Sequence, residues 1–477
     1  MKSDRTEPNL TVTMSPLHLH DESLLSPSQI QTYLQDGILV VPLLSSEELL
    51  EAQRGLVTTL WKECGVDVHD LEGTGWKLTR ASSTLGAGGF EMLPSVTSRG
   101  RRCAMERSGQ CILLLIDCIV FGRKSVTGDG LYSGVLDIFY PAWKMKIATN
   151  EKLFRMTCQL WKEAYCHNGE SFEEMMSSSV NGRDDSFKWH PFGAFDCNKG
   201  YMYIDRLGYR IPTEIAERIG QEIGENKTQT RSKKPRPIQR SLTPHFDCCP
   251  ETYHDAKSKN KWRPIQCFVS LTDNLHANTG GFEAVPGFHK EFLAWTKNGR
   301  QTTSLQQNED GKDTLKSVDG QFPSTKPHPR PCVGEYTHLH PNHDRELLQR
   351  VQHIPVQAGS AVFWDNRIPH GNAYRNNPPK LSCSTISNVD DEETSKVLGS
   401  SGSRAVVYCS FLPDVHVNRS FVKSQLTDWK LKRAPKVGNR WIKHEESNEI
   451  TGEVSNTTQI EANLTDLGRR LLGLDDW

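Results

Sequence analysis

Short apolar segments separated by glycine and proline dominate the central part of the chain, and they restrict its fold more than any other feature. Residues 265–270 alternate between Ile, Cys and Val on one face and Gln, Phe and Ser on the other, as in a strand. A turn at 279–281 and a second short strand follow, and Gly359 precedes a further apolar strand. Such strands are typical of a double-sheet jelly-roll. The sequence therefore predicts a mainly β fold with flanking helices.

A helix–strand–helix unit is expected before this core. Ser26 is placed to cap a helix that ends at Gly37, residues 38–44 resemble a buried strand, and Ser45 is placed to cap a second helix. We expect one domain over residues 26–440 with polar segments inside and around it. These segments are a disordered N-terminus at 1–25, insertions near 64–130, 297–345 and 384–403, and a polar tail at 441–477.

Composition and charge exclude several classes of protein. The 477 residues carry 57 Lys+Arg and 58 Asp+Glu, which argues against a basic surface for nucleic acid or membranes. The longest apolar run, at 111–121, is about half the roughly 20 residues that a membrane helix needs. The 13 cysteines form no CxxC pair, and no signal peptide or peroxisomal C-terminus is visible. We expect a cytoplasmic monomer with no nucleic-acid partner and no membrane span.

Two short motifs contain candidate metal ligands. In the segment TPHFD, His245 and Asp247 are two residues apart and project from the same face of a strand. In the segment GSAVFWDNRIPHG, an apolar strand and a short connection end at His370. Two histidines and one carboxylate form the facial set that binds non-haem iron(II) and leaves positions open for a co-substrate and oxygen. The HxD motif alone is weak, but its setting among short strands strengthens it.

Other residues with metal-binding side chains are interpreted as structural. We expect His254, His276 and His289 to lie in loops. Cys248 and Cys249 follow Asp247 directly, but a thiolate ligand would favour zinc, whereas the two histidines and the carboxylate favour iron. We therefore leave both cysteines out of the site.

Five blocks of the sequence resemble the phytanoyl-CoA dioxygenase family of iron(II)/2-oxoglutarate oxygenases. They are YLQDGILVVPLLSSEEL, TPHFD, LTDNLHANTGGFEAVPGFHKEF, AGSAVFWDNRIPHGN and RAVVYCSFLP, in the order of the family. The resemblance implies a double-stranded β-helix that holds iron and 2-oxoglutarate, with His245, Asp247 and His370 in the positions of the iron ligands. His245 and His370 are 125 residues apart, which is long for the family, and the polar 297–345 segment explains the excess.

The family also places a basic residue after the distal histidine, where it pairs with the far carboxylate of 2-oxoglutarate. Arg404, which opens a convincing strand, is the first candidate, and Lys380 and Arg375 remain alternatives. Gln266 and Asn372 are further candidates for contacts to 2-oxoglutarate, although each also has a structural interpretation.

The function that the resemblance implies is hydroxylation of a small-molecule or acyl substrate with O2, iron(II) and 2-oxoglutarate, with release of succinate and CO2. Ascorbate is a further cofactor that such enzymes use. Halogenation is disfavoured because Asp247 fills the position that a halide would need. Two alternatives remain: a non-catalytic jelly-roll that binds or scaffolds, and a zinc hydrolase or cupin-like isomerase with the same three ligands.

Overall fold

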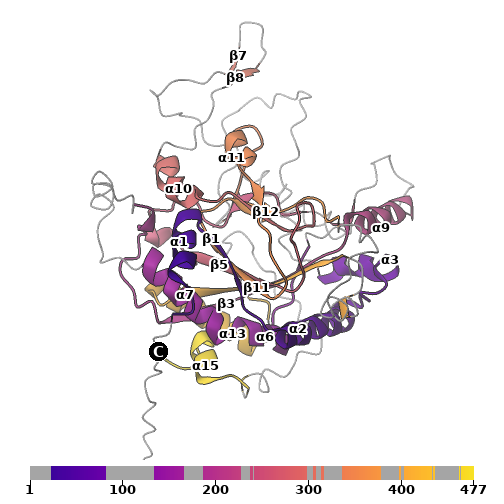
Figure 1. Cartoon of the computed structure of the whole chain (residues 1–477), viewed down its shortest axis with the longest axis horizontal. Helices are drawn as coiled ribbons and strands as arrows, with labels where there is room; N and C mark the ends of the chain where they lie inside the picture. The colour runs from indigo at the N-terminus through magenta and orange to yellow at the C-terminus, as the bar shows by residue number, and fades with distance from the viewer. Residues whose placement is uncertain are drawn as a thin grey trace, which may run out of the picture.

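Two antiparallel β-sheets with helices around them form the protein in its computed structural model (Figure 1). The structure describes residues 23–81, 134–165, 186–226, 237–239, 241–297, 305–307, 313–315, 336–377, 397–398, 402–431, 433–435, 461 and 463–477. The predicted mainly β architecture with flanking helices is confirmed at this level. In the described ranges, none of the helices combines the length and apolar character that crossing a membrane requires.

The larger sheet has six strands in the order β1-β11-β5-β13-β3-β2, and all neighbours are antiparallel. The predicted alternation of β5 is confirmed, because Cys267 and Val269 face the main core while Phe268 faces the opposite side. The strands are β1 (Ile38–Pro42), β2 (Val135–Leu136), β3 (Gly200–Arg210), β5 (Ile265–Ser270), β11 (Ser360–Asp365) and β13 (Arg404–Pro413).

The smaller sheet has five short strands in the order β10-β6-β12-β4-β9. They are β4 (His245–Phe246), β6 (Phe282–Ala284), β9 (Thr337–His338), β10 (Gln352–His353) and β12 (His370–Asn372). Phe282 and Ala284 from this sheet share one apolar cluster with Phe268 and Trp364 from the larger sheet. The two sheets therefore face each other across a buried interior. β7 (Leu305–Gln307) and β8 (Asp313–Leu315) form a separate pair.

Helices cover the other face of the larger sheet. Phe154 and Trp161 of α7 and Leu56 of α2 join Val269 and Phe363 in the main hydrophobic core. Figure 1 shows α2, α6, α7 and α13 on one side of this sheet and β12 on the other. The helices are α1 (Pro27–Asp36), α2 (Ser46–Thr59), η1 (Leu60–Cys64), α3 (Leu71–Thr74), η2 (Gly75–Ala81), α6 (Ala142–Ala148), α7 (Glu151–Ala164), η4 (Ser186–Lys188), α9 (Thr213–Asn226), η5 (Ala256–Ser258), α10 (Phe288–Lys297), α11 (Arg345–Gln349), α13 (His416–Lys430) and α15 (Asp466–Leu472).

The predicted caps of the N-terminal unit are confirmed. Ser26 and Gln29 form a capping box on α1, and Ser45 and Glu48 form one on α2. Gly37 ends α1 with a φ of 65°, and a Cβ there would lie 2.4 Å from the Ile368 side chain. Only glycine satisfies both the left-handed conformation and this close approach.

A fully buried ion pair holds the connection between β11 and β12. Arg367 donates from Nε and Nη2 to the two carboxylate oxygens of Asp365, at 2.8 and 2.6 Å. Tyr165, next to α7, donates its hydroxyl to the same carboxylate, and Arg367 also donates to the carbonyl of Phe187 in η4. Burial would raise the pKa of Asp365, but the Arg367 guanidinium holds it below its usual value. The chain that leads to His370 is therefore fixed to two helical segments.

Parts of the expected insertions and tail contain packed structure. In the 64–130 segment, residues up to 81 form α3 and η2 and bury Leu71 and Leu78 in the main core, while 82–130 lie outside the described residues. In the 297–345 segment, β9 joins the smaller sheet. In the expected polar tail, Leu471 and Leu472 of α15 are also buried in the main core. Most of the 384–403 segment and residues 1–22 lie outside the described residues.

Replacing Arg367 by alanine should destabilise the protein by about 3–5 kcal/mol, because it leaves the Asp365 carboxylate buried and unpaired. The matched control is Arg350→Ala, which removes a solvent-exposed bidentate pair with Glu291 and should cost about 1 kcal/mol or less. Urea denaturation followed by fluorescence measures both changes. Equal losses in the two variants would contradict the role given to the buried pair.

Candidate metal centre

His245 and His370 lie opposite each other on neighbouring strands of the smaller sheet. His245 opens β4, His370 opens β12, and the two residues are partners in the antiparallel register, with ring centroids 4.5 Å apart. Asp247 follows β4 by one residue, and its carboxylate reaches the same side as His245. The pairing of β4 with β12 therefore brings together side chains from two distant motifs.

The three side chains offer ligand atoms close enough for one metal ion. Nε2 of His245 lies 3.6 Å from Oδ1 of Asp247, and Nε2 of His370 lies 3.6 Å from Oδ2. All three ligand atoms lie within 4.8 Å of one another, and no other such group of His, Cys, Asp or Glu occurs among the described residues. Two imidazoles and one carboxylate fit a non-haem iron(II) centre that keeps further positions open.

Backbone contacts orient both imidazole rings. Nδ1 of His245 lies 2.8 Å from the carbonyl oxygen of Thr243, and Nδ1 of His370 lies 2.9 Å from that of Ile368. In a neutral ring, Nδ1 then carries the proton and Nε2 carries the lone pair. Histidine ligands are commonly held in this way, with the second nitrogen bound to a carbonyl or carboxylate. Both Nε2 atoms are thus prepared to bind a cation.

The protonation states suit a cation as well. Burial, together with the neighbouring His370, lowers the pKa of His245 to about 3 and keeps this ring neutral. Burial would raise the pKa of Asp247, but the two imidazoles and the guanidinium of Arg263 hold it well below its usual value. The site therefore presents a neutral histidine and an ionised carboxylate.

The carboxylate of Asp247 is fixed by two side chains, Arg263 just before β5 and Gln266 within β5. Nε2 of Gln266 donates to Oδ2 at 2.8 Å, and Nη2 of Arg263 lies 3.5 Å from the same oxygen. Arg263 also pairs with Asp205 at 3.2 Å. Gln266 was predicted to contact 2-oxoglutarate, and the contact that the structure gives it is to Asp247. The carboxylate is thereby held through one oxygen.

Aromatic rings surround the two histidines. The ring of Trp364 lies 5.2 Å from that of His370, and Phe282 lies 6.0 Å from it. Tyr336, which precedes β9, lies with its ring 4.6 Å from that of His245. Only 4% of His245 and 5% of His370 is exposed. These rings keep water from the buried side of the site, and the side chain of Asp247, which is 25% exposed, lies toward its open side.

Arg404 is buried at the start of β13 without a carboxylate partner among the described residues. Its Nε donates to Oδ1 of Asn274 at 3.0 Å, and its guanidinium lies 5.4 Å from the ring of Phe268. Its Nη2 is buried and has no hydrogen-bond partner in the described part of the chain. An unpaired buried donor on a cation is costly, so this position suits an anionic ligand.

The other candidates for 2-oxoglutarate contacts differ in their positions. Asn372 is buried in β12, where its backbone N–H donates to the carbonyl of Leu242. Arg375 is exposed, so it is a poor partner for a buried ligand. Lys380 lies outside the described residues. Of the two described basic candidates, Arg404 is the one that lies beside the buried interior.

Several residues interpreted as structural are now placed. The prediction that His289 lies in a loop is wrong, because it is buried in the first turn of α10, where its Nε2 contacts the carbonyl of Leu34 at 3.1 Å. His254 and His276 are exposed outside helices and strands, as expected. Cys248 is buried, which raises the pKa of its thiol, and Cys249 is disulfide-bonded. Neither belongs to the group of possible metal ligands, and the disulfide was not anticipated from the cysteine pattern.

Comparisons with known proteins find similarity of fold. No family model and no curated protein matches the sequence. A protein from Salmonella typhimurium LT2, described as a presumed oxidoreductase, is 13% identical with a TM-score of 0.50, over 94% of this chain and 83% of that one. GIG2 (DUF1479) from Candida albicans is 13% identical with a TM-score of 0.45, over 91% and 86%. The non-heme alpha ketoglutarate dependent carbocyclase SnoK from nogalamycin biosynthesis is 11% identical with a TM-score of 0.33, over 82% and 85%.

None of these matches names the phytanoyl-CoA dioxygenase family, so that resemblance stays a prediction from five sequence blocks. At 13% identity, the similarity to the Salmonella protein concerns the fold alone.

Replacing Gln266 by leucine should weaken metal binding about 10- to 100-fold, because it removes the hydrogen bond that orients the Asp247 carboxylate. Titration of the protein with Co(II), followed by calorimetry, measures this affinity. Gln357→Leu is the matched control, because Gln357 is exposed and lies outside the strands that carry the ligands. Metal affinity at the wild-type level in Gln266→Leu would show that the contact does not support the site.

Proposed function

We propose that this chain is an iron(II)- and 2-oxoglutarate-dependent oxygenase with a double-stranded β-helix core. His245, Asp247 and His370 would hold the metal. Iron bound there supplies activation of O2, coupled to conversion of 2-oxoglutarate to succinate and CO2 and to oxidation of a small-molecule or acyl substrate. The domain would extend over residues 26–440 and include the packed C-terminal segment 463–477.

The observation that carries this proposal is the set of three ligands in one place. Two imidazoles turn their Nε2 atoms toward one ionised carboxylate, and the three ligand atoms lie within 4.8 Å of one another. Catalytic zinc sites also use two histidines and one carboxylate, or thiolates with histidine. Here neither of the adjacent cysteines belongs to the group of ligand atoms, and Cys249 is disulfide-bonded.

The charges of the interior support 2-oxoglutarate as the co-substrate. Asp247 and Arg404 bring one negative and one positive charge into the space between the sheets. A divalent cation and a dicarboxylate would add two charges of each sign, so the occupied interior would be formally neutral. Buried charges are stable only when they are compensated in this way. Arg404 and Asn274 would bind the far carboxylate, since a guanidinium matches a carboxylate in shape and charge.

The chain's own residues would perform three tasks. Gln266 and Arg263 hold Asp247 through Oδ2 and leave Oδ1 toward His245. The carbonyls of Thr243 and Ile368 fix the ring orientation of the ligating histidines. The aromatic rings exclude water from the reacting position, which protects a reactive centre from side reactions.

The direct test is anaerobic addition of iron(II) and then 2-oxoglutarate, with the visible charge-transfer band of the ternary complex as the readout. We expect the band in the wild type and its loss in His245→Ala, because one ligand is missing. His276→Ala, which changes an exposed histidine, should retain the band. Bound iron without a band would show that 2-oxoglutarate is not the co-substrate, and would favour a scaffold protein or a zinc enzyme.

Replacing Arg404 by methionine should weaken 2-oxoglutarate binding by about 2 kcal/mol or more, or about 30-fold, because the buried carboxylate loses its cation. Metal affinity should stay at the wild-type level, since Arg404 contacts none of the three ligands. Titration of the iron-loaded protein with 2-oxoglutarate measures the first quantity, and Co(II) calorimetry measures the second. Arg375→Met is the control, and an equal loss there would contradict the assignment of Arg404.

A further inference from the structure

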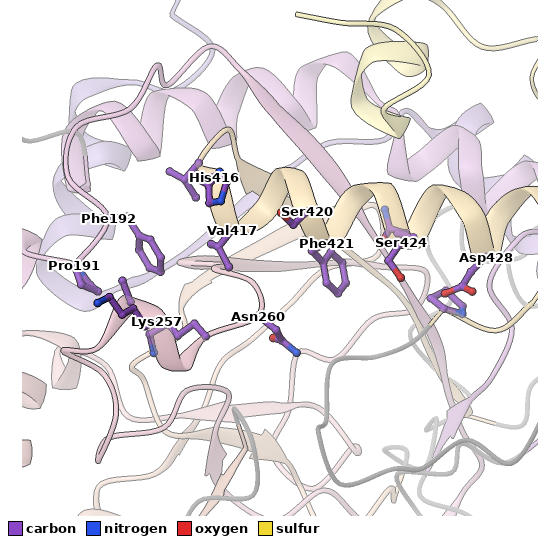
Figure 2. Close-up of a pocket in the computed structure, with 15 residues that line it drawn as sticks. Pro191, Phe192, Lys257, Asn260, His416, Val417, Ser420, Phe421, Ser424 and Asp428 are labelled. Carbon is purple, nitrogen blue, oxygen red and sulfur yellow. The ribbon is translucent and has the colours of Figure 1, made fainter.

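A cavity of about 760 Å³ opens beside the N-terminal half of α13. This volume lies within the roughly 300–1,000 Å³ of typical small-molecule sites. Figure 2 shows Val417 and Phe421 pointing from α13 toward a facing segment that carries Lys257 and Asn260. We refer to this space as the α13 cavity, and define it by Phe192, Lys257, Asn260, Val417, Phe421 and Ser424 among its lining residues.

The α13 cavity lies at the end of the larger sheet where β5 begins, near Gln266, which contacts Asp247 of the metal centre. β13 ends at Pro413 and leads into the cavity wall at Val415, while the antiparallel β5 begins at this same end. The N–H of Cys267, which follows Gln266, donates to Ser410 Oγ at 3.0 Å and marks this end of both strands. The residues that hold Asp247 and those that line the cavity are thus neighbours in the fold.

Contacts between side chains connect the cavity to the metal centre. The ring of Phe421 lies 5.8 Å from that of Tyr203 and is stacked on it. The guanidinium of Arg263 lies 4.5 Å from the ring of Tyr203, and Nη2 of Arg263 lies 3.5 Å from Asp247 Oδ2. Along this line, two side chains, Tyr203 and Arg263, lie between the cavity lining and the carboxylate of the centre.

The cavity combines an apolar surface with positive charge. Phe192, Val417 and Phe421 provide the apolar part. Basic residues recur at every second position of the facing segment, where Lys257 and Lys259 line the cavity and Lys261 lies with Nζ 5.6 Å from the ring of Phe421. In a chain with a formal net charge of −1, this is a local excess of cations.

One acidic residue, Asp428, also lines the cavity, and it is 3% exposed. Figure 2 places it at the opposite end from Phe192 and Lys257. The cavity is therefore polarised along its length, with Lys257 at one end and a buried carboxylate at the other. A ligand with an apolar body and an anionic group would match the end at Lys257.

We propose that the α13 cavity binds the part of the substrate remote from the reacting atoms, and that this part is an apolar body with a carboxylate, sulfonate or phosphate group. The statement that the bound molecule is the substrate rests on the proposed function. The binding of an anion with an apolar body in the α13 cavity is independent of that function, because it needs neither metal nor 2-oxoglutarate.

The test compares two fluorescent probes on the metal-free full-length protein. Anilinonaphthalene sulfonate and phenylnaphthylamine share one aromatic body, and only the first carries a negative charge. We expect one sulfonate probe to bind per chain, about threefold tighter than the neutral probe, as a partly exposed lysine would give. Equal affinities would overturn the anionic part of the proposal, and binding of neither probe would overturn it altogether.

Three substitutions locate the binding. Ser424→Trp fills the cavity from an exposed position of α13 and should weaken the binding of both probes about tenfold or more. Thr427→Trp is exposed on the same helix outside the cavity and should leave the binding of both probes unchanged. Lys257→Ala should weaken binding of the sulfonate probe about threefold and leave binding of the neutral probe unchanged. Lys257→Arg should bind the sulfonate probe as tightly as the wild type does. Equal effects of Ser424→Trp and Thr427→Trp would place the probes elsewhere.

A final measurement decides whether the occupant is the substrate. In the enzyme loaded with iron and 2-oxoglutarate, bound sulfonate probe should change the rate of 2-oxoglutarate consumption, and Ser424→Trp should abolish this effect. A bound probe without any effect on that rate would make the cavity a separate site. If the wild type consumes no 2-oxoglutarate, the proposed function fails and the substrate role fails with it, while the probe affinities still decide the binding site.

Discussion

The position of His370 depends on a buried ion pair that takes no part in metal binding. Removing two charges from water costs several kcal/mol per ion, so such a pair is stable only when each group has further hydrogen-bond partners. Asp365 and Arg367 find them in Tyr165 and the carbonyl of Phe187. Because these partners belong to the helical layer, that layer fixes the connection that leads into β12. The register of β12 with β4 then sets His370 against His245.

The sequence predicted those features that depend on near neighbours along the chain. A strand has a period of two residues, so His245 and Asp247 were expected on one side, and the alternation in β5 was expected to bury Phe268 away from Cys267. The helix caps at Ser26 and Ser45 also depend on residues three positions away. Local physical rules were sufficient in each of these cases, since no distant segment competes with them.

Features that depend on contacts between distant strands could not be predicted from the sequence. The amide of Gln266 binds Asp247 because the two sheets face each other. Asn274, which follows β5, binds Arg404 because β5 pairs with β13. Tyr336 was overlooked since it lies in a polar segment that has the composition of a loop. Burial of His289 at α10 follows from tertiary packing, and the disulfide of Cys249 could not be inferred from a scattered set of 13 cysteines.

The pairing of β4 with β12 has a consequence for how this protein reaches its native state. Two strands of two and three residues meet across 125 residues of chain, and such a contact forms only after a large loss of chain entropy. A cation held by both strands would act as a cross-link that the unfolded chain cannot use. It would stabilise the folded state according to its free concentration relative to its dissociation constant. The supply of metal in the cell would then influence how much of the protein survives proteolysis, in addition to its activity.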